Sequence, residues 1–216
     1  MNDLPRPTAF AGLGPHDLAA LSEWLSALFA GPPDREAVAS YRRGPAAAWL
    51  VEIAAIPGCA GGAMRIRQAL NAEADDAQIA ARVGAAYGLL FEGIGGPKTV
   101  SPYESVHRSG RLFGAATAEM EAILAAHDLS VPASAHEAAD HVAVELATAA
   151  RLLAEAEPDA ATVFDRLQTW IPDFAAACAA ADSCGFWAGA AEILTAIVGL
   201  ATRQPDEAKT LDAVVH

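Results

Sequence analysis

Two short segments carry most of the side chains that could do chemistry in this sequence. The first, residues 101–108, contains serine and histidine; the second begins at Asp140 and places His141 and Glu145 four residues apart. On a helix that spacing puts both side chains on one face, where they would form a surface pair, hold a metal ion or act as a general base. A carboxylate at Asp140 would also favour the positive end of a helix dipole.

A metal site or a catalytic centre would need more than this pair. A metal ion requires at least one further ligand, and His107, His127 and His136 stand at no supporting spacing. A nucleophile paired with His141 would be Ser105, but no strand-to-helix elbow surrounds that serine. The three cysteines form no CxxC pair, which argues against a zinc ribbon and a disulfide framework. We therefore predict no catalytic residues, no metal and no cofactor.

Composition and charge indicate an acidic helical protein. The chain has 216 residues, of which 53% are hydrophobic and 19% charged, and this is enough to bury one sizeable core. Alanine, the best helix former, is abundant. The formal net charge of −13 repels nucleic-acid phosphate and anionic lipid. Because no secretory leader or long apolar run is evident, we expect a cytoplasmic protein with no nucleic-acid partner and no stable membrane insertion.

Apolar residues recur at helical spacing along most of the chain, with Gly and Pro between the periodic stretches. We predict an all-α fold with one domain over residues 15–202, a flexible N-terminus (1–14) and a frayed C-terminal tail (203–216). The spacing predicts a first helix that stops at Gly31, a connection over residues 128–135, a long helix over about residues 136–155 and a last helix over about residues 186–201. Pro172 is expected to kink a helix or to start a fresh one. Because Lys98, Arg108 and Arg111 outnumber Glu104, the segment around residues 98–111 is locally basic. The expected core residues are Leu25, Leu28, Trp49, Ile53, Val83, Leu90, Leu124, Leu146, Leu153, Leu167, Trp170, Leu194 and Val198.

The most irregular segment, residues 93–102, is rich in Gly and Pro. Without a preceding strand or a Walker-type lysine, its glycines predict a loop with positive φ angles and not a nucleotide site. The aromatic residues Tyr87, Phe91, Tyr103 and Phe113 flank this loop. At the mouth of a helical bundle such side chains would offer a groove for a peptide, and at helical spacing they are equally consistent with ordinary core.

Five motifs follow one another along the chain: Tyr87–Phe91, Gly95-Gly96-Pro97, Pro102–His107, Asp140–Leu146 and Trp170–Phe174. In their order and spacing, over about residues 15–202, they resemble the TorD/DmsD/NarJ family of chaperones, which assist the maturation of molybdenum-containing redox enzymes. His107 stands where the family usually has Tyr, and Ala139 where it usually has Pro. The resemblance implies a TorD-like bundle of roughly ten helices.

The resemblance also implies a function and a set of contacts. The partner would be the catalytic subunit of a molybdenum-containing oxidoreductase. The chaperone would bind the N-terminal signal segment of this subunit, which often carries a twin-arginine motif, or both this segment and the folded body. Binding would hold the subunit in the cytoplasm until the cofactor is inserted. The chaperone would be a monomer or a weak or domain-swapped dimer. The positions that the resemblance assigns to client binding are Tyr87, Leu90, Phe91, Pro102, Tyr103, Ser105, Asp140, His141 and Glu145.

A twin-arginine signal is a cationic stretch followed by an apolar one. The carboxylates of Asp140 and Glu145 would pair with the arginines through charge-assisted hydrogen bonds. Leu90, Phe91 and Tyr103 would receive the apolar part. Two alternatives stay open: a small-molecule or nucleotide-binding regulatory helical domain, and an enzyme built on the histidine–glutamate pair. If the protein is a chaperone, we expect an elongated groove. A regulatory domain would instead have a compact polar pocket, and an enzyme would have convergent titratable groups with perturbed pKa values.

Overall fold

The computed structural model describes residues 13–71, 74–93, 96, 99–132 and 137–203. The expected flexible N-terminus and C-terminal tail therefore fall almost wholly outside the described residues. Within these ranges the secondary structure consists of ten α-helices and no strand, which confirms the all-α prediction. The helices are α1 (Pro15–Ala30), α2 (Arg35–Arg43), α3 (Pro45–Ala54), α4 (Ala60–Leu70), α5 (Asp76–Phe91), α6 (Glu104–Ser109), α7 (Ala115–Ala126), α8 (Val142–Ala154), α9 (Asp159–Ala181) and α10 (Phe186–Ala201).

Local sequence explains where several helices begin. Asp34 caps α2, its carboxylate accepting a 2.8 Å hydrogen bond from the backbone N–H of Ala37. Asp75 caps α5 in the same way through Gln78, whose side chain accepts in return from the backbone of Asp75. Pro15 opens α1, where the missing N–H is not needed. Each of these helix starts is therefore encoded within a few residues.

Of the two outcomes expected at Pro172, a kink or a fresh helix, the second does not occur. Helix α9 runs from Asp159 to Ala181 with Pro172 inside it, so no fresh helix begins there. Ile171 and Phe174, on either side of the proline, are both fully buried. Their packing offsets the hydrogen bond that a proline removes from a helix.

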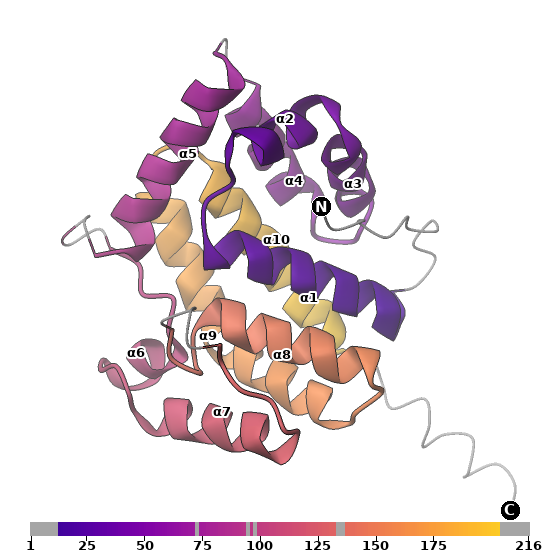
Figure 1. Cartoon of the computed structure of the whole chain (residues 1–216), viewed down its shortest axis with the longest axis vertical. Coiled ribbons are helices and arrows are strands. Elements are labelled where there is room, and N and C mark those ends of the chain that lie inside the picture. Colours follow the sequence, from indigo (N-terminus) through magenta and orange to yellow (C-terminus); the bar gives the residue numbers. More distant parts are fainter. Residues whose placement is uncertain (1–12, 72–73, 94–95, 97–98, 133–136, 204–216) are drawn as a thin grey trace, which may run out of the picture.

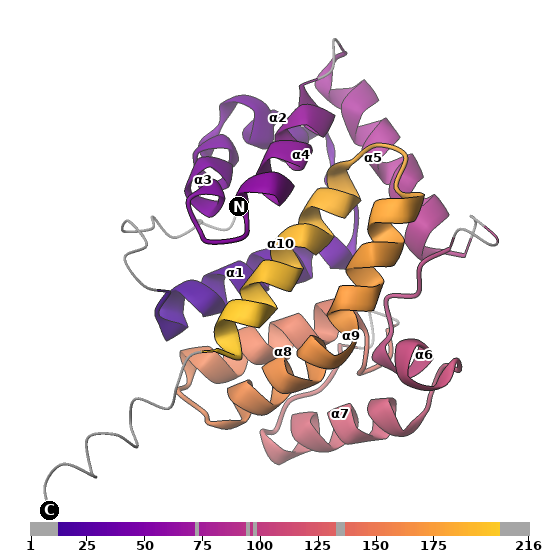
Figure 2. The same cartoon turned by 180° about the vertical axis from the view of Figure 1, so that it is seen from behind.

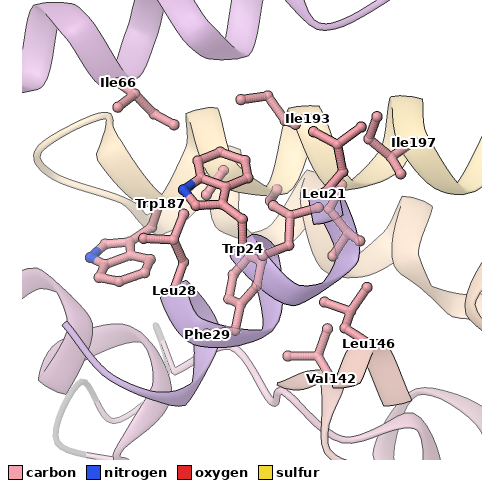
Figure 3. Packing of buried hydrophobic residues seen from close by; sticks show 14 of the residues in the cluster. Leu21, Trp24, Leu28, Phe29, Ile66, Val142, Leu146, Trp187, Ile193 and Ile197 are labelled. Carbon is pink, nitrogen blue, oxygen red and sulfur yellow. The ribbon is translucent and has the colours of Figure 1, made fainter. Parts of the chain in front are cut away.

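Helix α1 crosses the middle of the molecule and packs most extensively on α8, while α10 lies on its other side (Figures 1 and 2). Figure 3 shows Leu28 and Phe29 of α1 between the two neighbours, with Val142 and Leu146 contributed by α8 and Ile193 by α10. Helices α2–α5 gather at one end of the bundle, and α6 and α7 at the other. The N-terminal helix is thus the centre of the core.

The predicted core is confirmed at all positions but one. Leu153 is only half buried, and Leu152 takes the interior position on α8. Leu124 is buried, but it packs with Met120 and Ala139 in a small separate cluster beneath α7. Helical periodicity therefore identifies the buried stripe correctly to within one residue.

Helices α4 and α10 cross at Gly62 and Gly189. A Cβ atom on Gly62 would lie 2.5 Å from the carbonyl oxygen of Gly189, and one on Gly189 would lie 2.6 Å from the carbonyl oxygen of Gly62. Both contacts are with backbone, which cannot swing away as a flexible side chain can. Only glycine at both positions allows the helices to approach this closely.

The three cysteines are free thiols, with Cys59 and Cys178 buried and Cys184 half buried. Burial raises the pKa of all three thiols, so they are neutral and unreactive at physiological pH. Across the described ranges, no helix combines the length and apolarity needed to span a membrane.

Candidate functional site

The two segments that the sequence singles out lie side by side. An isolated antiparallel bridge joins Tyr103 to His141, and the backbone N–H of Val142 donates to the carbonyl of Pro102 at 2.8 Å. Because the chain is extended at the bridge, α8 begins at Val142 and not near residue 136 as predicted; residue 136 itself lies outside the described part. The short helix α6, which the sequence did not indicate, starts directly after Tyr103.

Asp140 is fully buried and both of its carboxylate oxygens have internal donors. One oxygen accepts a 2.9 Å hydrogen bond from the backbone N–H of Ser105, and the other a 2.8 Å hydrogen bond from the hydroxyl of Thr117. The carboxylate therefore stabilises the N-terminal end of α6, not that of α8, and links α6 to α7. It has no free oxygen to offer a client arginine, so its place is that of a positioning residue.

His141 caps α8. Its Nδ1 accepts a 3.2 Å hydrogen bond from the backbone N–H of Ala143, which leaves the ring hydrogen on Nε2. The ring meets Tyr103 edge-on with 5.0 Å between centroids, and Nε2 lies 3.9 Å from the carboxylate of Glu137. Burial lowers the pKa of His141, so the imidazole is neutral at physiological pH.

Glu145 is fully buried in the interior and does not form a surface pair with His141. The indole N–H of Trp170 donates to its carboxyl group at 3.3 Å. Burial raises the pKa of Glu145 well above its ordinary value, and the neighbouring Glu104 carboxylate raises it further. Burial therefore disfavours the ionised form of Glu145, and its side chain does not reach the surface where a client arginine would bind.

An ion-pair network that runs from the buried Glu104 to the exposed Glu119 fixes α6 and α7 to α9. Glu104 is almost completely buried and accepts hydrogen bonds from Arg108, at 3.1 Å, and from Arg166. Both arginines also donate to Glu119 at 2.7 Å. The basic side chain of Arg108 is thus neutralised within the fold, so it adds little to the locally basic character that the sequence indicated.

Five of the nine predicted positions line one cavity of about 390 Å³. They are Tyr87, Phe91, Pro102, Tyr103 and His141. The cavity lies where the end of α5, the start of α8 and the segment before α6 meet, and the end of α1 at residues 30–32 forms another wall. Residues that are far apart in the sequence therefore converge on one hollow, as the peptide-groove hypothesis requires.

Two carboxylates at this cavity escaped the sequence analysis. Glu137 is one-third exposed and accepts a hydrogen bond from the hydroxyl of Tyr103. Glu92 follows α5 and is exposed. The one available signal was that Glu137 stands four residues before His141. These two carboxylates are accessible at the cavity, whereas those of Asp140 and Glu145 are buried.

The remaining predicted positions do not line the cavity. Leu90 is 2% exposed and belongs to the core. The hydroxyl of Ser105 is buried and has no hydrogen-bond partner among the described residues, so it is not activated by His141. In the same part of the chain, no three His, Cys, Asp or Glu side chains are grouped so that they could hold a metal ion. Gly93 and Gly96 have φ angles of 75° and 58°, as the loop prediction required.

Comparison with known proteins identifies the family. A sequence model described as the nitrate reductase delta subunit matches residues 57–178, which is more than half of the chain. The chain belongs to this family, the TorD/NarJ chaperones. The matched region contains both halves of the Tyr103–His141 bridge and most of the cavity wall. The resemblance drawn from the motifs is thereby confirmed.

Three similar curated proteins are all named as TorD chaperones. "Chaperone protein TorD" of Photobacterium profundum is 28% identical over 195 residues, covering 82% of this chain and 88% of the relative. The protein of that name from Vibrio cholerae is 25% identical over 189 residues, covering 81% and 86%. A third, from Vibrio atlanticus, is 32% identical over 117 residues, covering 47% and 54%. The TorD/NarJ protein described here is a chaperone-family member and not an enzyme.

Proposed function

We propose that this protein is a cytoplasmic chaperone for the catalytic subunit of a molybdenum-containing oxidoreductase. It binds the N-terminal, twin-arginine signal segment of that subunit and holds the client until cofactor insertion and assembly are complete, before export. The observation that carries the proposal is the cavity in which the two family motifs meet beside two exposed carboxylates. Membership of the TorD/NarJ family gives the client class.

The chemistry of the cavity suits arginine. Glu137 and Glu92 present carboxylate oxygens, and a guanidinium group pairs with carboxylates through strong, charge-assisted and often bidentate hydrogen bonds. Phe91 and Tyr103 add aromatic surface, against which a guanidinium packs favourably. The net charge of −13 adds a long-range attraction for a cationic segment.

Asp140 and His141 support this site indirectly in our proposal. Asp140 holds the start of α6, and the bridge between Tyr103 and His141 fixes the floor of the cavity. The carboxylates at the rim disfavour the nucleotide-binding alternative, because they repel phosphate. A peptide carries no phosphate group, so these carboxylates do not oppose its binding.

The test is isothermal titration of the full chain with a synthetic signal peptide that carries an arginine pair and an apolar run. We expect micromolar or tighter binding, about −8 kcal/mol or more. Affinity should fall between low and high salt without disappearing, because the charged part is screened and apolar burial is not. A control peptide with glutamine in place of both arginines should bind much more weakly. Absence of binding heat with every signal peptide of a molybdoenzyme would refute the proposal.

A further inference from the structure

A second hollow of about 420 Å³ adjoins the cavity described above. It lies between α1 and α8, and residues 129–132, which follow α7, close it on a third side. Ala30 and Glu137 line both hollows. The two hollows are therefore neighbours, with Glu137 at their common border.

The floor of the second hollow is apolar. Leu129, Val131, Val144 and Ala147 all line it, and Ala147, on the exposed face of α8, is accessible to a ligand. In the sequence, residues 128–135 have the pattern of a simple connection, and Leu129, Val131 and Ala147 belong to none of the motifs. An apolar ligand that covers this surface would bind favourably, because binding removes apolar surface from water.

Two hydroxyl groups beside this floor are already hydrogen-bonded within the protein. The hydroxyl of Ser26 donates to the carbonyl of Ala143 at 2.7 Å, and the hydroxyl of Thr148 donates to the carbonyl of Val144 at 2.8 Å. Arg151 is paired with a glutamate of its own helix at 2.6 Å. A polar ligand would therefore lose its hydration here without gaining new partners, which is unfavourable.

We propose that this hollow is a second subsite, which takes the apolar run that follows the arginines of the client's signal segment. The inference rests on the proposed function and adds a binding direction to it. The arginines occupy the first cavity beside Glu137 and Glu92, and the chain then continues over Ala147 between α1 and α8. The occupant follows from complementarity: a cationic stretch followed by an apolar one matches a hollow lined by carboxylates that adjoins an apolar hollow.

Ala147 allows this subsite to be tested without touching the core. Ala147→Trp fills the hollow from its exposed side, and Ala147→Glu places a charge in it. The matched control is Ala176→Trp, at an exposed position on α9 that lines neither hollow. Each full-length variant is titrated with two synthetic peptides of equal length and charge. Both carry an arginine pair, followed by about ten residues that are either leucine and alanine or serine and glutamine.

The wild type should bind the apolar peptide at least about tenfold more tightly than the polar one. Ala147→Trp and Ala147→Glu should abolish this preference and leave the affinity for the polar peptide within about twofold of the wild type. Ala176→Trp should change neither affinity. Circular dichroism of each variant verifies that the helical fold is intact.

The outcomes separate the two proposals. If the wild type binds both peptides equally and the Ala147 variants change nothing, the subsite is refuted while the arginine cavity stands. If the wild type binds neither peptide, the proposed function fails and the subsite with it. A change in sedimentation on Ala147→Trp, with peptide affinity unchanged, would assign the hollow to self-association and also overturn the inference.

Discussion

Asp140 stabilises the first turn of α6 through the 2.9 Å hydrogen bond that its carboxylate accepts from the backbone N–H of Ser105, which lies 35 residues before it in the chain. The aspartate of the family motif is thus held inside the fold, together with Thr117. This changes what its replacement should do. The sequence had suggested a role in binding more than in stability, whereas full burial of a satisfied carboxylate predicts a large effect on folding.

We expect Asp140→Ala to lower the free energy of unfolding by about 2–3 kcal/mol, because it leaves two buried donors without an acceptor. Asp140→Asn should cost less, since its amide oxygen still accepts one of the two hydrogen bonds. Urea denaturation followed by circular dichroism measures both. Asp173→Ala, at an exposed position of α9, is the control and should stay within about 0.5 kcal/mol of the wild type.

A second prediction concerns pH and the buried Glu145. Its pKa in the folded protein is raised above the ordinary 4.5 by burial and by Glu104. The folded state therefore binds the proton more tightly than the unfolded state. The contribution of Glu145 to the free energy of unfolding is therefore fully present below pH 4.5. It decreases by up to about 1.4 kcal/mol per pH unit as the pH rises towards the pKa of Glu145 in the folded protein.

Glu145→Gln should remove that pH dependence, because the amide imitates the neutral acid. Relative to the wild type, the variant should therefore gain stability as the pH rises above 4.5. Denaturant titrations at a series of pH values measure the difference. The control is Glu157→Gln, at an exposed position, which should leave the dependence of the unfolding free energy on pH unchanged. If Glu145→Gln also showed the same pH dependence as the wild type, Glu145 would be ionised in the folded protein and the prediction would be wrong.

The third prediction separates the carboxylates that face the client from those that are buried. Glu137→Gln should weaken binding of an arginine-pair peptide by about tenfold, the loss of one charge-assisted hydrogen bond. Its salt dependence should decrease as well. Calorimetric titration at two ionic strengths checks both effects. Glu121→Gln, an exposed carboxylate on α7 outside both hollows, should bind as the wild type does.

The fourth prediction uses two helical glycines with opposite expected signs. Gly189→Ala should destabilise the protein by about 1–3 kcal/mol, because the added Cβ meets the backbone of α4. Gly84→Ala on α5 meets only Pro32 at 3.8 Å, so it should be neutral or stabilise by up to about 1 kcal/mol through helix propensity. Thermal and urea unfolding of both variants test the pair. Equal effects would mean that the α4–α10 crossing is not tightly packed.

The helices were predictable because their signals are local. The range 186–201 predicted for α10 coincides with the observed helix, and the stop at Gly31 marks the end of α1 as expected. Of the two outcomes expected at Pro172, a kink or a fresh helix, the fresh helix does not occur, because the residues around the proline are buried within one continuous helix. The start of α8 was misplaced because the bridge to Tyr103 depends on a segment almost forty residues away, which no local pattern reveals.

The candidate site was predictable in part. The motifs identified the segments that meet at the cavity, including Tyr103 and His141. They did not indicate which polar side chains face solvent, because charged residues are ordinarily exposed and become buried only where distant partners satisfy them. The donors to Asp140 and Glu145 come from α6, α7 and α9, and their convergence is a property of the fold.

The packing of α1 against α8 has a consequence for synthesis on the ribosome. The 2.7 Å hydrogen bond between Ser26 and Ala143 joins residues 117 positions apart, so α1 waits for α8 to be translated before it finds its main partner. At about 5–20 residues per second this interval is on the order of ten seconds. Until then neither hollow has both of its walls. We therefore expect the nascent chaperone to be unable to engage a client until most of its own chain has emerged.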